Sequence, residues 1–288
     1  MTRYRILQKV VELGSFTKAA EQLGYTQSSV SQMVASLEKE MGIKLLTRSR
    51  SGTELTIEGK EIYPYVERII NQHRIMQEKI SEIKGIESGV VRIGTIASIT
   101  YQWMPELVKG FQKIYPNVQF LFQQGDYSSI QEWIKNGTVD FGFVTAPAVT
   151  DLKTRALTRG EMLLILPLSH PMARKPSVRL EEICQEPFIL LEEGNYNEAM
   201  LAFDKANLRP NLKFTIHDDF TIMRMVENGM GISILSELIL RDTNYQIVSI
   251  PLDPPVYRDL SIGYRGDDSI PIASKRFISY LYDHISGL

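Results

Sequence analysis

The spacing of the hydrophobic residues changes its period near Gly89, and this change limits what the 288-residue chain can fold into. Before Gly89 the apolar residues recur every three or four positions, which is typical of amphipathic helices. After it, short apolar runs that favour strands alternate with helical segments. Since a domain typically has about 100 to 200 residues, the length and the two patterns together predict two or three domains.

Residues 1–58 predict three helices followed by a two-stranded wing. Gly14, Gly24 and Gly42 each stop a helical pattern, and Thr26 is well placed to cap the third helix. Two short helices joined by a tight turn that contains glycine are typical of a helix-turn-helix. Apolar residues on both sides of the polar stretch 48–52 then predict a hairpin. We therefore expect a mainly α-helical, winged helix-turn-helix domain.

Residues 59–88 predict one long helix that ends in a hinge. Seven positions follow alternating spacings of four and three and form a coiled-coil seam: Ile62, Val66, Ile69, His73, Met76, Ile80 and Ile83. A seam of this length needs a partner helix, and the nearest candidate is a second copy of the chain. We therefore expect this helix to form a homodimer.

Residues 89–288 predict an α/β domain with a mainly parallel sheet. The expected strands cover nine segments: 90–94, 118–122, 140–144, 162–166, 188–191, 213–216, 232–235, 247–250 and 260–264. Helical segments separate several of them, which favours parallel strands covered by helices. The length suffices for two lobes, which we place at about 89–161 with 266–288 and at about 162–265.

The charges divide the chain at a similar place. Residues 1–60 carry nine basic and six acidic side chains, whereas the remainder carries 23 basic and 28 acidic ones. A basic head on an acidic body indicates nucleic acid at the amino-terminal end. The single cysteine, Cys184, leaves no intrachain disulfide, and no segment approaches the ~18 apolar residues that span a bilayer. We expect a cytoplasmic protein without membrane contact.

The motifs of the chain resemble those of the LysR-type transcriptional regulators. In the head, the matching residues are Leu7, Val10, Gly14-Ser15-Phe16, Ala19-Ala20, Leu23, residues 26–32, Leu37-Glu38, Gly42, Leu45-Leu46, Arg48, Leu55-Thr56 and Gly59. In the body, they are Met104-Pro105, Phe111, Tyr115-Pro116, Gly137, residues 139–142 and residues 229–232. This resemblance implies a dimerising linker helix, a two-lobed effector domain like a periplasmic binding protein, a homotetramer, and contact with RNA polymerase.

We assign DNA contacts to the start of the third helix and to the wing. The assigned residues are polar or basic: Thr26, Gln27, Ser28, Ser31, Gln32, Arg48 and Arg50. A helix in the major groove presents its first residues to base edges, where Gln pairs well with adenine, and wing arginines suit phosphate or the minor groove. The alternative is a plain solvated helix face. The family usually has Pro at the place of Ser28 and a basic residue at that of Gln32, so we expect less electrostatic groove contacts here.

We assign the effector site to the ends of strands in the body. Ligands of open parallel sheets bind beyond the carboxyl ends of the strands, near the N-termini of helices. The residues expected at that edge are Ser98, Ile99, Thr100, Gln124, Gly125, Thr145, Pro147 and Thr221. Ordinary helix capping is the alternative for each, but their convergence on one cleft resembles the family's inducer site. The hydroxyl groups weakly favour a small anionic or polar effector.

Catalysis has little support in the sequence. The four histidines, His73, His170, His217 and His284, lack the spacing of metal ligands. Residues 229–231 follow a helix and precede a strand, which is the reverse of a dinucleotide-binding turn. We expect no catalytic residue, no metal and no cofactor other than the effector. The alternative function is a small-molecule-binding protein or enzyme whose head contacts other proteins.

Overall fold

The structure is a computed structural model that describes residues 1–49, 52–83 and 88–285. The chain forms two compact units, one made mainly of residues 1–80 and the other mainly of residues 81–288. Each unit has its own hydrophobic packing: one core in the first unit, and three core clusters in the second. Each unit therefore has its own source of stability.

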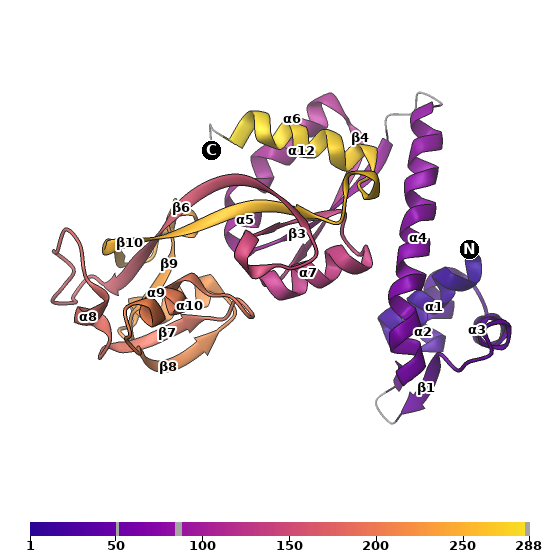
Figure 1. Ribbon diagram of the computed structural model, residues 1–288, viewed down its shortest axis with the longest axis horizontal. Coiled ribbons are helices and arrows are strands. Elements are labelled where there is room, and N and C mark those ends of the chain that lie inside the picture. Colours follow the sequence, from indigo (N-terminus) through magenta and orange to yellow (C-terminus); the bar gives the residue numbers. More distant parts are fainter. Residues whose placement is uncertain (50–51, 84–87, 286–288) are drawn as a thin grey trace. The chain divides into compact units, whose positions relative to one another are not determined.

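The first unit contains the predicted winged helix-turn-helix (Figure 1). Helices α1 (Thr2–Leu13), α2 (Phe16–Leu23) and α3 (Gln27–Met41) precede the antiparallel strands β1 (Leu46–Ser49) and β2 (Gly52–Leu55). The apolar faces of the helices meet in one core that includes Ile6, Leu7, Val10, Ala19, Ala20, Val30, Val34 and Leu37. Gly24 ends α2 at φ 70, a left-handed conformation that glycine adopts without strain. This sharp stop lets α3 begin three residues later.

The buried carboxylate of Glu38 ties the wing to α3. Its Oε1 accepts hydrogen bonds from the backbone N–H groups of Leu45 and Leu46 at 2.9 and 3.1 Å. Its Oε2 accepts a hydrogen bond from Lys44 Nζ at 2.7 Å. Burial alone would raise the pKa of Glu38, but the three hydrogen bonds outweigh it and lower this pKa. The wing therefore starts from a fixed point on α3.

Helix α4 (Ile57–Ile83) runs through the linker region, and its apolar stripe has two different environments. Val66 is 1% exposed and packs with Ile62 into the core of the head. Ile69, Met76 and Ile80 are 43, 49 and 37% exposed. The prediction that the whole seam faces a partner helix is therefore wrong for its first two positions, because the head covers them.

A six-stranded mixed sheet forms the centre of the second unit. Its strands are β3 (Ser88–Thr95), β4 (Asn117–Gln124), β5 (Phe141–Val144), β6 (Lys153–Pro167), β9 (Ser233–Ser236) and β10 (Ile247–Tyr264), in the order β4-β3-β5-β10-β6-β9. Strand β3 pairs in parallel with β4 and β5, whereas β10 is antiparallel to both β5 and β6. The predicted mainly parallel sheet is wrong, because the two expected strands 247–250 and 260–264 are one long strand that returns alongside β6.

Lobe I surrounds the parallel strands β3, β4 and β5. Figure 1 shows α6 (Met104–Ile114) and α12 (Ile272–His284) on one face of these strands and α7 (Tyr127–Asn136) on the other. The short elements α5 (Ala97–Gln102), η1 (Ala146–Ala148) and η2 (Asp267–Ser269) lie in the connections. Phe111, Phe141, Phe143 and Phe277 are fully buried in the core of this lobe.

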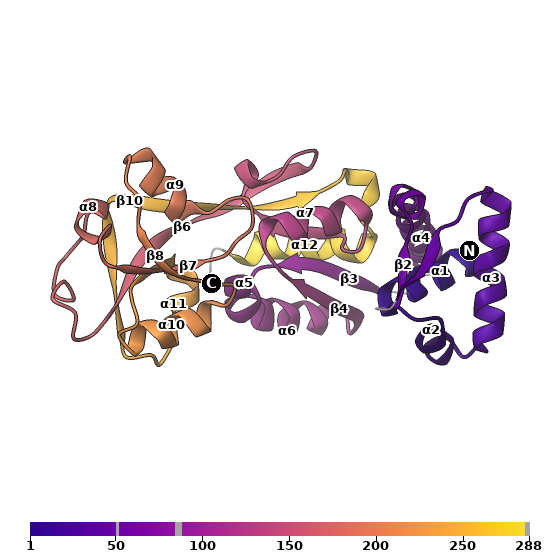
Figure 2. The same cartoon turned by 90° about the horizontal axis from the view of Figure 1, so that it is seen from below.

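Lobe II is built around the parallel strands β7 (Pro187–Leu191) and β8 (Asn211–Ile216). Figure 2 shows α9 (Glu198–Lys205) on one side of this pair and α10 (Asp219–Glu227) on the other. The side chains of β7 alternate accordingly, since Phe188 packs in one core and Ile189 in a second. Helices α8 (Leu180–Ile183) and α11 (Glu237–Leu240) complete the lobe. The sheet thus separates two small cores.

Strands β6 and β10 run side by side from one lobe to the other (Figure 1). In β10, Ile250 and Leu252 belong to a core of lobe II, whereas Leu260 and Ile262 belong to the core of lobe I. The expected lobe boundary at residue 265 is therefore wrong, because the chain changes lobe within β10. Residues 257–259 of this strand cross between the lobes.

Candidate functional site

The N-terminus of α3 presents a polar surface. Thr26 caps the helix, and its Oγ1 accepts a hydrogen bond from the backbone N–H of Ser29 at 3.2 Å. The side chains of Gln27, Ser28 and Gln32 are exposed, and Ser31 is half-buried. All five assigned residues of the third helix thus lie at or near one end of α3. The cap fixes the first turn, so the exposed side chains stand on a rigid element.

The wing brings two further candidates to the head. Arg48 lies in β1 opposite Thr53 of β2, and the hairpin is joined to α1 because the N–H of Thr53 donates to the carbonyl of Gly14 at 2.8 Å. Arg50 lies outside the described residues. The structure therefore gives the backbone position of Arg48 within the predicted wing.

A cleft of about 230 Å³ lies between the two lobes of the second unit. The ends of β3, β4 and β7 and the N-termini of α5, α7 and α10 surround it, and its lining residues are Ile96, Ala97, Gln124, Gly125, Asp126, Tyr127, Leu191, Glu192, Glu193, His217 and Asp219. Two of the eight residues assigned to the effector site, Gln124 and Gly125, line this cleft. The carboxyl edge of the parallel strands is thus where a cavity forms.

The other assigned residues have different surroundings. Ser98 is buried, and its Oγ accepts a hydrogen bond from Arg258 Nη2 at 2.9 Å. Thr100 Oγ1 donates to Thr95 Oγ1 or to the carbonyl of Ile96, both at 3.0 Å, and it lines a different pocket beside α6.

Like Ser98 and Thr100, the remaining four assigned residues lie outside the lining of the cleft. Ile99 is fully buried in the core of lobe I, and Thr145 is 2% exposed. Pro147 is exposed in η1, while Thr221 is exposed and hydrogen-bonded to Asp218 at the start of α10. The structure therefore does not gather the eight residues into one site.

The wall of the cleft contains a buried charge cluster, none of whose residues is among those assigned to the effector site from the sequence. Arg258 of β10 is 4% exposed, and its Nη1 lies 3.7 Å from Glu193 Oε1. Glu198 and Asp219 are 5 and 7% exposed, and both are close enough to affect the pKa of Arg258. Tyr127 of lobe I donates a hydrogen bond to Glu198 Oε1 of lobe II at 3.4 Å. Three carboxyl groups therefore share one guanidinium at the boundary of the lobes.

Burial dominates the ionisation of this cluster. It raises the pKa of Asp219 to about 6, although Arg258 opposes this shift. Burial and the neighbouring Glu198 raise the pKa of Glu193 well above its usual value, and burial also raises that of Glu198. Burial alone would lower the pKa of Arg258, but its acidic neighbours raise it, so the guanidinium stays charged. The cluster thus contains three carboxyl groups and only one cation, the guanidinium of Arg258.

The alternation of side chains along β10 is the one sequence pattern that indicates a buried Arg258. Residues 258, 260 and 262 fall on the same side of a regular strand, and Leu260 and Ile262 are apolar core residues. A charged residue at a core-facing position indicates a buried polar contact, since Arg is almost never fully buried unless it is paired. Glu193 and Glu198 lie in a connection and at a helix start, where acidic residues are common, and no local pattern distinguishes them.

A winged helix-turn-helix and a two-lobed α/β domain with a cleft define the class of ligand-controlled DNA-binding proteins. Family models match both parts. Residues 1–60 match the bacterial regulatory helix-turn-helix protein of the lysR family, and residues 84–286 match the LysR substrate binding domain. The chain belongs to the LysR family of transcriptional regulators. The predicted family and fold class are confirmed.

Relatives and solved structures agree with this assignment. The uncharacterized HTH-type transcriptional regulator YwbI of Bacillus subtilis (strain 168) is 31% identical over 284 residues, which cover 96% of this chain and 94% of YwbI. A full-length OxyR variant from Pseudomonas aeruginosa has a TM-score of 0.76 at 24% identity and covers 99% of this chain and 94% of its own. Full-length CbnR in complex with its target DNA has a TM-score of 0.70 at 18% identity and covers 98% of both chains. The two solved structures share the fold.

None of the helices in residues 1–49, 52–83 and 88–285 combines the length and the apolar character that crossing a bilayer requires. Within the same ranges, no three His, Cys, Asp or Glu side chains are grouped so that they could hold a metal ion.

The raised pKa of Asp219 makes the stability of the fold depend on pH. Between about pH 4 and pH 6 the folded protein keeps a proton that the unfolded chain releases, so stability falls as pH rises through this window. We expect Asp219→Asn to increase the free energy of unfolding by about 2 to 3 kcal/mol at pH 7, and to have little effect below about pH 4. Urea unfolding of the full chain at both pH values measures this difference.

The exposed Asp204 provides the matched control, because Asp204→Asn makes the same chemical change in solvent. We expect this control to stay within about 0.5 kcal/mol of the unmodified protein at both pH values. A stabilisation by Asp219→Asn that is equally large at low pH would contradict a titrating carboxyl group.

Proposed function

We propose that this LysR-type regulator reads its operator with the N-terminus of α3 and senses a small molecule in the cleft between its lobes. In this proposal residues 1–58 bind DNA, residues 59–88 form the dimer, and residues 89–288 bind the effector. The observation that supports the sensing role most strongly is Arg258, whose guanidinium contacts Ser98 of lobe I and Glu193 of lobe II beside the cleft. A ligand that binds there acts on the boundary of the lobes.

The effector controls DNA binding through differential affinity. A ligand shifts an equilibrium only by the difference between its affinities for the two arrangements. The cleft is lined from both lobes, by Gln124 and Tyr127 on one side and by Glu193 and Asp219 on the other. A ligand that contacts both sides therefore favours one lobe geometry over another. In an oligomer, this geometry sets the spacing of the DNA-binding heads.

DNA recognition is assigned to Thr26, Gln27, Ser28, Ser31 and Gln32 of the helix start, with Arg48 and Arg50 of the wing. The exposed amides of Gln27 and Gln32 suit base edges in the major groove. CbnR, whose fold this chain shares, is known in complex with its target DNA, which supports the same use of the head here. The assembly acts in the cytoplasm, where its partners are duplex DNA and RNA polymerase.

The exposed part of the α4 stripe forms the dimer. Ile69, Met76, Ile80 and Ile83 are between 37 and 75% exposed, and they follow the spacing of a coiled-coil seam. A second copy of α4 would cover them with the same surface, as two-fold symmetry requires. Two such dimers give the homotetramer that the family resemblance implies.

Substitution of Gln27 tests the DNA-reading role. We expect Gln27→Ala to lose about 1 to 3 kcal/mol of preference for the operator over random DNA, because it removes a base contact. Binding assays with both DNAs at one salt concentration measure this loss. Gln77→Ala, an equal truncation of an exposed residue in α4, should leave the preference unchanged. Equal losses of affinity for both DNAs after Gln27→Ala would refute base readout.

Substitutions that introduce charges into the exposed stripe of α4 test whether this helix forms the dimer. We expect the double variant Ile69→Lys with Ile80→Lys to dissociate the α4 dimer, because it places like charges within the seam. Gln72→Lys with Gln77→Lys adds the same charge at exposed positions that flank the stripe, and it should leave the dimer intact. Sedimentation velocity measures the oligomeric state of both double variants. An unchanged oligomer for the first variant would show that α4 does not form the dimer.

The cleft is tested with a ligand identified by thermal-shift screening of the full chain. We expect Gln124→Ala to weaken the binding of that ligand about tenfold, as the loss of one good hydrogen bond does. Gln123→Ala is the matched control, since Gln123 precedes it in β4 but does not line the cleft. Calorimetry measures both affinities. Unchanged affinity after Gln124→Ala would place the ligand away from this side chain.

A further inference from the structure

The wall of the cleft between the lobes is acidic. Its lining contains the imidazole of His217 and four carboxyl groups, one from lobe I and three from lobe II: Asp126, Glu192, Glu193 and Asp219. The described residues that line the cleft include no lysine or arginine. The assigned residues whose hydroxyl groups weakly favoured an anionic effector lie outside this lining. The chemistry of the wall therefore differs from that expected from the sequence.

Asp219 is an unpaired acid in this wall. It is only 7% exposed. Apart from its own backbone N–H, no described residue donates a hydrogen bond to its carboxyl group or forms an ion pair with it. Among the described residues of the cluster, the one carboxyl oxygen that is both fully covered and unpaired belongs to Glu198, so the carboxyl group of Asp219 keeps accessible surface at the cleft. A largely buried acceptor without a donor is costly, so this position favours a ligand that donates hydrogen bonds.

The nearby guanidinium of Arg258 does not supply the missing partner. Arg258 is 4% exposed and does not line the cleft. Its Nη2 donates to Ser98 at 2.9 Å, and its Nη1 lies 3.7 Å from Glu193. Burial raises the pKa of Asp219 to about 6, so this carboxyl group is still mostly ionised at pH 7. A negative charge therefore faces the cleft without a direct partner.

The N-termini of α7 and α10 are already occupied by carboxyl groups of the chain itself. Asp126 Oδ1 accepts a hydrogen bond from the N–H of Ser129 at 2.8 Å in the first turn of α7. Asp218 Oδ2 accepts one from the N–H of Thr221 at 2.8 Å in the first turn of α10. The positive end of a helix dipole attracts an anion, and here that anion is an aspartate. An anionic ligand would therefore meet like charges at both helix ends.

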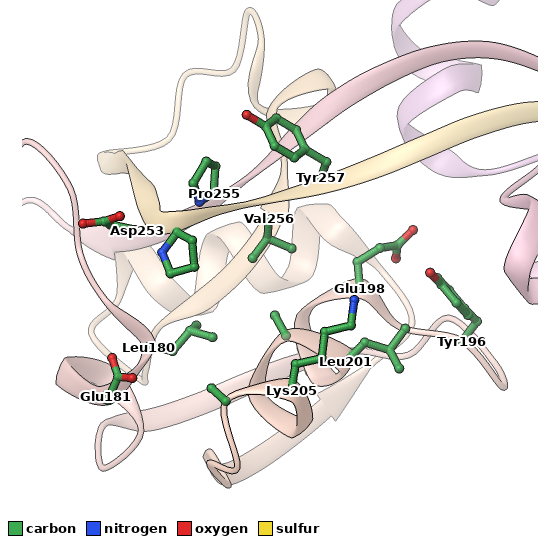
Figure 3. A pocket seen from close by; sticks show the side chains of 13 residues that line it. Leu180, Glu181, Tyr196, Glu198, Leu201, Lys205, Asp253, Pro255, Val256 and Tyr257 are labelled. Carbon is green, nitrogen blue, oxygen red and sulfur yellow. The ribbon is translucent and has the colours of Figure 1, made fainter.

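The larger cavity of lobe II has a different charge balance (Figure 3). It has a volume of about 430 Å³, lies between α9 and residues 253–257 of β10, and shares no lining residue with the cleft. Its lining includes the amine of Lys205 together with the carboxyl groups of Glu181 and Asp253. Its buried acid, Glu198, is hydrogen-bonded to Tyr127 and to Glu193. The cleft, rather than this cavity, therefore has a wall that favours a cation.

We propose that the effector of the cleft is a small organic ammonium ion, which donates hydrogen bonds to the carboxyl group of Asp219 and contacts Gln124 of the opposite lobe. This inference rests on the proposed role of the cleft as the effector site, and it adds the chemical class of the ligand. The volume of about 230 Å³ suits a chain of only a few carbon atoms. Because Asp126 and Asp219 belong to different lobes, a molecule with an ammonium group at each end is attracted to both walls.

Three probes with the same four-carbon chain test the proposal on the full-length protein. Butane-1,4-diamine carries ammonium groups at both ends, butane-1,4-diol carries hydroxyl groups and succinate carries carboxylates. Calorimetry should show that the diamine binds at least about tenfold more tightly than the diol, because its hydrogen bond to the carboxylate is between charged groups. Succinate should bind most weakly. Equal affinity for the diamine and the diol, or no saturable binding of the diamine, overturns the proposal.

Substitution of Asp219 assigns the binding to this side chain. Asp219→Asn should weaken diamine binding about tenfold or more, because it removes the charge of the acceptor. The same substitution is expected to stabilise the fold, so unfolding cannot explain a loss of binding. Asp204→Asn removes a charge from an exposed position outside the cleft and should change the affinity less than about threefold. Equal affinities of the Asp219→Asn variant and the unmodified protein overturn the assignment.

Gln124→Ala separates failure of this inference from failure of the proposed function, because it shortens a side chain of the cleft without changing its charge. If the diol or succinate binds more tightly than the diamine and Gln124→Ala weakens that binding, the cleft is a sensing site whose ligand is not a cation, and only the present inference is overturned. If the diamine binds and neither Gln124→Ala nor Asp219→Asn weakens its binding, the amine binds outside the cleft. That result also overturns the inference, while the ligand identified by screening still tests the cleft.

Discussion

The arrangement of the two lobes depends on the contacts of one buried guanidinium. Arg258 donates to Ser98 at the start of α5 in lobe I and lies 3.7 Å from Glu193 in lobe II. It belongs to the part of β10 that crosses between the lobes, so neither lobe can move far without changing its contacts. A motion that separated Arg258 from both Ser98 and Glu193 would be costly, because the guanidinium would stay buried without its direct partners. The cluster is therefore a strong constraint on lobe geometry.

The fold places this constraint where a ligand can reach it. Glu193 and Asp219 belong to the cluster and also line the cleft. Because β6 and β10 pass continuously from one lobe to the other, the lobes can change their relative angle without breaking either core. A ligand that neutralises or pairs with these carboxyl groups then alters the energy of one lobe arrangement relative to another. The buried carboxyl groups thus connect ligand binding in the cleft to the relative arrangement of the two lobes.

Local patterns predicted the head well, because its elements are set by neighbours in the sequence. Thr26 caps α3, and Gly24 ends α2. Patterns that depend on distant contacts were less informative: Val66 fits a coiled-coil seam, yet it packs in the head, and β10 was divided into two strands. The charge cluster is not predicted by any local pattern, because its residues come from β10, α9, α10 and the connection after β7, and only folding brings them together.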